Sequence, residues 1–189
     1  MIGLLIYIMS TVLENLLMQD SEFSESKFKS KVENEFVQIR LSMVTGKTER
    51  INHFVNDETF NKIAQKVADD QANNRIQMYD ELNVANVSLD SIQELDDCFE
   101  IDVTVHWKAL EYYLDRSTRK FLSGNNSYRT EHDCSIVFKK IKNNKALGTA
   151  RKCPSCGASV DINNNGKCDY CGAIFPLQNY DWTITYMDI

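Results

Sequence analysis

The chain has 189 residues, 43% of them hydrophobic and 25% charged, which suits one globular domain with a small appendage. Its formal net charge of −6 argues against a nucleic-acid-binding protein, because such proteins present a strongly basic surface. With 7 glycines and 2 prolines it is not a low-complexity chain, and its apolar content can form a core without disulfides.

The first predicted element is an apolar helix within residues 1–20. Its stripe at helical spacing consists of Ile2, Leu5, Met9, Val12 and Leu16. The uninterrupted apolar run, residues 2–9, is shorter than the roughly 20 residues that span a bilayer, and no Lys or Arg of a signal peptide precedes Lys27. We expect the helix to dock on its own domain or on a second copy, forming a homodimer. The alternative is that it contacts a membrane surface or is the cut end of a longer anchor.

Two more helices are predicted next. Ser24 can cap the first of them and Gly46 ends it. Its core-facing residues are Phe28, Val32, Phe36, Ile39 and Met43. The second helix restarts near Asp57, with an apolar face of Phe60, Ile63, Ala64, Val67 and Ala68. Residues 69–74 are polar, so we expect them to fray or to continue as an exposed end.

From about Leu82 the apolar period changes to two, which predicts strands. The alternation switches parity between Val84 and Val87, which indicates a β-bulge. The clearest strand places Phe99, Ile101, Val103, Val105 and Trp107 on one face. Residues 111–129 are interpreted as strand, turn, strand, turn, and strands at 128–138 and 182–186 follow. This order predicts an α+β fold with N-terminal helices packed on an antiparallel sheet.

Two Cys-x-x-Cys pairs precede the last strand. They are formed by Cys153, Cys156, Cys168 and Cys171, with 11 residues between the pairs. Four thiolates at this spacing predict one structural zinc ion per chain in a small ribbon, with a closed shell that leaves no position for catalytic water. Gly157 and Gly172, directly after each pair, suit the tight turns around a metal.

Other interpretations of the cysteines fit less well. A redox motif needs one pair at a helix start, and disulfides need an oxidising compartment. The segment from Asp161 to Gly166 resembles the first half of a calcium loop, but Gly172 stands where the bidentate carboxylate belongs. Cys98 and Cys134 lie in strand patterns, where we expect small buried apolar groups.

Several stretches together resemble a known family. "FKSKVENEFVQIRLSMVTGKTERINHFVNDETFNKI", "NVSLDSI", "IDVTVHWKALEYYLD" and "YDWTITYMDI" are similar to the C-terminal domain of Tim forty-four, the import-motor anchor of the mitochondrial inner-membrane translocase. The cysteine unit just before "YDW" resembles a bacterial subgroup of that family with a C-terminal zinc ribbon. This chain lacks the long basic N-terminal region of the mitochondrial members, which puts an import-motor role in doubt.

The resemblance implies a fold and an organisation. The fold is a curved antiparallel sheet wrapped on helices, the cone of cystatin and of nuclear transport factor two. The cone would comprise residues 21–150 plus 180–189, with the zinc ribbon at 151–179 inserted before the last strand. The mitochondrial relatives are similar to scaffolds that bind other proteins and anionic lipid, and no catalytic residues carry over from them.

Two polar groupings are candidate sites. Glu100, Asp102 and His106 share one strand face, which we expect to be a solvated outer face, since no nucleophile with a neighbouring base is visible. The basic run comprises Lys139, Lys140, Lys142, Lys145, Arg151 and Lys152. Its functional interpretation is a contact with an anionic membrane surface or with RNA; the plainer one is a solvated linker into the ribbon.

The sequence therefore predicts a non-enzymatic binding or scaffold module with a protein partner that it does not identify. We expect a cytoplasmic protein, peripheral to the inner face of the cell membrane or bound to a membrane complex. The alternative is an enzyme or small-molecule-binding protein that uses the interior of the cone. The lining of that interior separates the two, because an enzyme needs convergent polar groups there and the inferred lining is apolar.

Overall fold

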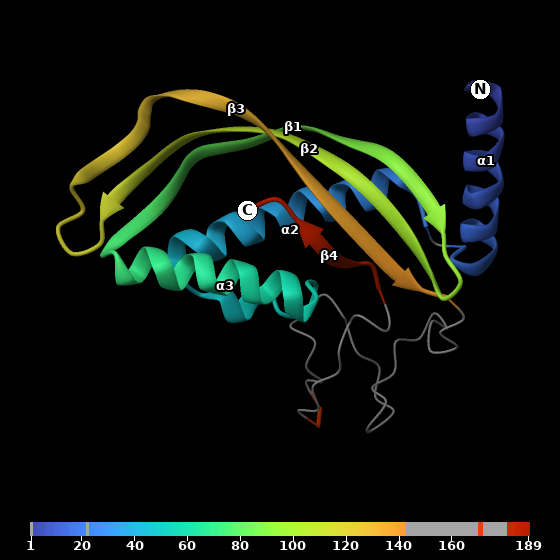
Figure 1. Ribbon diagram of the computed structural model, residues 1–189, viewed down its shortest axis with the longest axis horizontal. Coiled ribbons are helices and arrows are strands. Elements are labelled where there is room, and N and C mark those ends of the chain that lie inside the picture. The colour runs from blue at the N-terminus through green and yellow to red at the C-terminus, as the bar shows by residue number, and fades with distance from the viewer. Residues whose placement is uncertain (1, 22, 143–169, 172–180) are drawn as a thin grey trace.

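The computed structural model describes residues 2–21, 23–142, 170–171 and 181–189. Helices come first: α1 (Ile2–Gln19), α2 (Glu25–Thr45), the 3-10 turn η1 (Thr48–Arg50) and α3 (Asp57–Ala72). The strands are β1 (Arg75–Glu94), β2 (Cys98–Asp115), β3 (Phe121–Ile141) and β4 (Thr183–Met187), in one antiparallel sheet of order β1-β2-β3-β4. The α+β prediction is confirmed, whereas the ribbon lies almost entirely outside the described residues. The curved sheet arches over α2 and α3, which lie on its concave side (Figure 1).

Local signals set the helix boundaries. Ser24 Oγ accepts a hydrogen bond from the Lys27 N–H at 3.3 Å, as an N-cap residue does. Gly46 ends α2 in the left-handed conformation with φ 73°, and its N–H donates to the Ser42 carbonyl. Asn56 caps α3 by accepting from the Thr59 N–H at 2.9 Å. The predicted start and end of α2 are confirmed.

The end of α3 differs from the prediction. The helix continues to Ala72, and Asp70 is buried rather than exposed. Its carboxylate accepts from Lys66 Nζ at 2.9 Å and from Arg75 Nε at 2.7 Å. Two cationic partners make burial of this carboxylate tolerable, and a polar sequence window alone does not reveal such partners.

Strand β1 begins before the predicted point. It starts at Arg75, whereas apolar alternation is readable only from Leu82. The early part hides its period because Gln77 is buried while the apolar Ile76 and Met78 are only half-buried. The bulge predicted after Val84 is confirmed by a register shift between Val84 and Asn86.

Strand β3 corrects a second expectation. The sequence predicts a turn near residues 123–127, but one turn at 116–120 is followed by a continuous strand. The pairing register moves from Ala109↔Thr130 to Glu111↔Asn125, so a bulge absorbs the extra residues of β3. Gly124 enters this region with φ 100°, and a Cβ there would lie 2.6 Å from the Glu111 carbonyl oxygen. Turn-forming residues thus serve a bulge within a strand.

The core fills the concave side of the sheet. The predicted inward-facing residues of β2 are all buried: Phe99, Ile101, Val103, Val105 and Trp107. Phe28 of α2 packs edge-on against Phe138 of β3, with ring centroids 5.2 Å apart. Trp182, just before β4, lies 5.3 Å from Phe28, so the returning C-terminal strand closes one side of the core. The predicted last strand is confirmed.

Helix α1 docks at one end of the sheet, away from the β2–β3 turn (Figure 1). Leu16 is fully buried, and Asn15 Nδ2 donates to Glu94 Oε2 at 2.8 Å. The last turns of α1 therefore pack on its own domain, as one of the two expected arrangements requires. The homodimer stays a prediction. Of the described helices, none has the length and apolar character needed to cross a membrane.

Candidate functional site

The predicted zinc ligands cannot be placed together. Cys153, Cys156 and Cys168 lie outside the described residues, and Cys171 lies exposed in a turn. Across residues 2–21, 23–142, 170–171 and 181–189, no cluster of three or more His, Cys, Asp or Glu side chains is suited to a metal. The zinc site stays a prediction. Cys98 and Cys134 are buried, as expected, and burial raises the pKa of the Cys134 thiol to about 11.

The described part of the basic run does not form one free cationic surface. Lys139 pairs with Glu100 at 2.9 Å, whereas the neighbouring Lys140 is buried and pairs with Asp20 at 2.5 Å. Successive strand residues point to opposite faces, which separates these two charges. Lys142 pairs with Glu94 at 3.0 Å. Lys145, Arg151 and Lys152 lie outside the described residues, and the anionic contact itself stays a prediction.

The outer face of β2 carries the predicted polar residues, and the structure adds partners that sequence reasoning missed. His106 Nδ1 lies 2.6 Å from Asp133 Oδ1, and His106 Nε2 lies 3.2 Å from Ser88 Oγ. Asp102 accepts from Ser91 Oγ at 2.5 Å. Strand register brings these groups together. His106 of β2 lies opposite Asp133 of β3, and after the bulge in β1 it lies opposite Asn86 of that strand.

Ser88, His106 and Asp133 have the connectivity of a nucleophile, a base and an orienting acid. Catalysis by such a set also needs hydrogen-bond donors aimed at the developing oxyanion in a site that excludes water. Here Asp133 is 68% exposed and His106 39% exposed, on a convex face that no helix of Figure 1 covers. The arrangement is a solvated polar network, as expected for this face.

The core contains two buried charged groups from α2, and each is stabilised by its neighbours in the fold. Glu35 is buried beside Lys31, with Oε1 2.6 Å from Nζ, and Asp181 is 3.1 Å from the same nitrogen. Burial raises the pKa of Glu35 to about 7, although Lys31 opposes the shift. No carboxylate among the described residues pairs with the buried Arg40; its guanidinium lies 4.9 Å from the ring centroid of Trp107, one of three rings around it. Cation–π contacts take the place of a counter-ion here.

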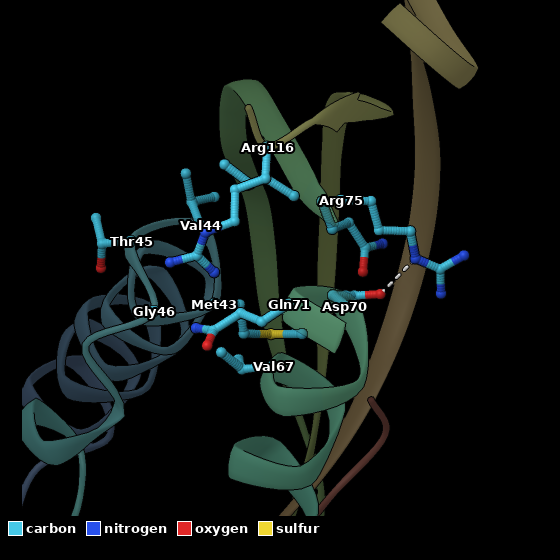
Figure 2. A pocket seen from close by; sticks show the side chains of 11 residues that line it. Met43, Val44, Thr45, Gly46, Val67, Asp70, Gln71, Arg75 and Arg116 are labelled. Carbon is cyan, nitrogen blue, oxygen red and sulfur yellow. Dashed lines mark hydrogen bonds and ion pairs between the residues drawn. The ribbon is translucent and has the colours of Figure 1, made fainter. Parts of the chain in front are cut away.

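One pocket lies at one end of the concave side, between the C-terminal ends of α2 and α3 and the start of β1 (Figure 2). It contains about 350 Å³ of empty space open to solvent. Its lining includes Met43, Val67, Gln71, Gln77 and Arg116. Buried Gln77 donates to Glu111 at 2.5 Å, but its Oε1 has no protein partner. Figure 2 shows the Arg116 side chain turned toward this space, while Arg75 is held by Asp70.

Comparisons with known proteins give one family match. A family model described as a Tim44-like domain matches residues 9–148. A solved structure, described as the crystal structure of the intermembrane space region of chloroplast protein ARC6, is similar over 85% of this chain and 94% of that chain. Its sequence identity is 8% and its TM-score 0.46, a likeness that supports no conclusion about function. No curated protein matches the chain.

Proposed function

Since this chain belongs to the Tim44-like domain family, a family of protein-interaction scaffolds associated with membrane complexes, we propose that it is a non-enzymatic module that holds a protein partner. The match confirms the resemblance at the level of the family. The zinc-ribbon subgroup remains part of the proposal, as does a cytoplasmic position at the inner face of the membrane.

The apolar packing of the described residues along the concave side of the sheet supports this proposal. An enzyme or small-molecule carrier of this shape would use the concave side of the sheet as its pocket. In this chain α2 packs against the concave side. Phe36 of α2 and Ile101 and Val105 of β2 are fully buried between them. The pocket of Figure 2 lies at one end of this apolar packing, where Met43 and Val67 border it. Function would then reside on the outer surfaces.

The cysteine unit supports the module as a structural extension. Its pairs lie in the segment between β3, which ends at Ile141, and β4, which begins at Thr183. Both ends of that segment are therefore held by the same sheet. We propose that Cys153, Cys156, Cys168 and Cys171 bind one zinc ion that shapes this segment and enlarges the docking surface.

Elemental analysis tests the zinc proposal. Protein purified without chelator should contain about one zinc ion per chain, and Cys168→Ser should lose it while the sheet stays folded, because the core does not include the ribbon. Cys98→Ser is the matched control and should retain zinc. A wild-type zinc content near zero would contradict this part of the proposal.

We propose that contact with the membrane is made through the partner. Lys139, Lys140 and Lys142 each neutralise a carboxylate, so they contribute little net attraction to an anionic bilayer. The test is affinity isolation of the tagged chain, cross-linked at native expression level, from membrane and cytosolic fractions. We expect a discrete protein complex in the membrane fraction. A chain that stays monomeric in both fractions, or that floats on pure anionic vesicles, would contradict the proposal.

A further inference from the structure

The convex face of the sheet changes character toward the β2–β3 turn. Strand register places an apolar cluster there, which we call the hairpin-end patch. It consists of Ile76, Met78, Leu110, Tyr112, Leu114 and Phe121. These side chains lie on the opposite face from Tyr79, Ala109 and the core. The cluster therefore belongs to the solvent side of the sheet.

No described helix covers this patch, of which Phe121 is exposed and the other five residues are half-buried. Figure 1 shows α2 and α3 beneath the concave face and α1 at the far end of the sheet. Phe121 is 47% exposed, and its ring lies 6.2 Å from that of Tyr112. Gly124 pairs with Tyr112 from β3 and contributes no side chain to cover it. Exposed apolar clusters of this kind mark interaction surfaces, because they gain free energy when a partner removes them from water.

The turn beside the patch carries unpaired positive charge. The Asp115 carboxylate is occupied, because it accepts from the Thr118 N–H of the turn at 2.7 Å and from Asn74 Nδ2, between α3 and β1, at 2.9 Å. Arg119 and Lys120 form no ion pair with any residue that the structure describes. A hydrogen bond to Asp80 raises the pKa of Tyr112, and the charge of Arg119 opposes that shift, which places Arg119 within electrostatic reach of the patch.

From these observations we propose that the hairpin-end patch binds an amphipathic helix of a partner protein, with acidic residues of that helix at Arg119 and Lys120. The proposal rests on the proposed function and names the docking surface. A helix suits a sheet face, just as α2 covers the concave face, whereas an added strand would need a sheet edge. Leu110 to Leu114 span roughly 13 Å of strand, which matches between two and three helical turns.

An anionic bilayer fits this surface less well than a helix does. Asp80 and Glu131 lie on the same face, opposite Leu110 and Lys108 in the strand register. A membrane surface would bring its negative charge against both carboxylates. A peptide helix can place its acidic residues at the turn alone, so it gains the attraction of Arg119 without that repulsion.

A peptide-binding measurement tests the proposal on the full chain. The probe is an 18-residue helical peptide with leucines on one face and glutamates at one end, and its counterpart has lysines in place of the glutamates. By fluorescence anisotropy we expect the glutamate peptide to bind at least about tenfold more tightly than the lysine peptide. Leu114→Thr and Phe121→Gln should each weaken binding about tenfold, and Arg119→Glu with Lys120→Glu should reverse the preference.

Leu41→Gln is the matched control, because Leu41 is 52% exposed on α2 and lies away from the patch. It should leave peptide binding unchanged, and circular dichroism should show that all variants are folded. The proposal is overturned if neither peptide binds, if Phe121→Gln has no effect, or if the chain binds anionic vesicles instead. Self-association abolished by Phe121→Gln, without peptide binding, would equally overturn it in favour of a second copy.

The proposed function fails separately from this inference. If the complex isolated from membranes survives Phe121→Gln unchanged, the partner docks elsewhere and the hairpin-end patch is not its site. If no complex is found at all, the scaffold function itself is wrong.

Discussion

Two stretches of one sheet face differ sharply in this protein. At the centre of the convex face, His106, Asp133 and Ser88 satisfy one another in a polar network. A few residues along the same strands, Leu114 and Phe121 present apolar groups to the same solvent. Neither stretch is covered by a described helix, so the fold does not explain the change. The centre pairs its polar groups with one another, whereas the hairpin end leaves apolar groups that no described helix covers.

A substitution in the core, on the concave face, should give the largest loss of stability. Phe138 is fully buried and touches Phe28, so Phe138→Ala should lower the free energy of unfolding by about 3–5 kcal/mol. Urea denaturation measures this loss. A loss below about 1 kcal/mol would mean that the concave side is not the core. The two faces of the sheet would then not differ in burial as described.

A buried charge gives the next largest effect, and it depends on pH. The pKa of Glu35 is raised to about 7 in the folded chain, so the native state holds a proton that the unfolded state releases at lower pH. The free energy of unfolding should therefore fall as pH rises from about 4.5 through 7. Glu35→Gln should remove this fall. On going from pH 5 to pH 8, the free energy of unfolding of the variant should therefore rise by about 1–3 kcal/mol relative to that of wild type.

Thermal or urea denaturation at both pH values checks the prediction. A Glu35→Gln variant that is less stable than wild type at pH 8 would show that the ion pair with Lys31 outweighs the cost of burying the carboxylate.

The hairpin end should contribute to binding without contributing much to stability. Leu114 is only half-buried, and threonine suits a strand, so Leu114→Thr should change the free energy of unfolding by less than about 1 kcal/mol. Urea denaturation measures this change alongside the loss of peptide binding. A cost comparable to that of Phe138→Ala would identify the cluster as a satellite core that needs no partner.

The polar centre should give the smallest effect. His106→Ala removes two hydrogen bonds of exposed groups, so the free energy of unfolding should change by no more than about 0.5 kcal/mol. Recovery of the membrane complex by affinity isolation should be unchanged. Loss of the complex from this variant, with folding intact, would place function at the centre and reverse the comparison.

The sequence predicts the concave side of this fold well and the convex side poorly. Capping by Ser24 and Gly46, and the alternation from Phe99 to Trp107, are local signals of one buried face. The start of β1 differs from the prediction because polar Gln77 faces inward there while apolar Ile76 and Met78 face outward, the reverse of the usual pattern. The contacts of His106 depend on register between three strands, and no single stretch of sequence encodes that register.

The predictions for the turn residues of β3 and for the end of α3 were wrong for related reasons. Gly124 and Asn125 are typical of turns, but long-range pairing with β2 holds them in a strand. Asp70 lies in a polar window, and only its two cationic partners make its burial tolerable. The cysteine pairs depend least on such context, because ligand spacing is itself local, and their zinc stays a prediction.

Photo-cross-linking in living cells tests most directly whether the hairpin end is the docking surface. A benzophenone side chain is placed at Phe121 in one variant and at Thr104, in the polar centre of the same face, in the other. We predict a protein adduct from position 121, with the cross-linked peptide rich in apolar and acidic residues, and none from position 104. Equal adducts from both positions, or a lipid or self-adduct at position 121, would contradict the account.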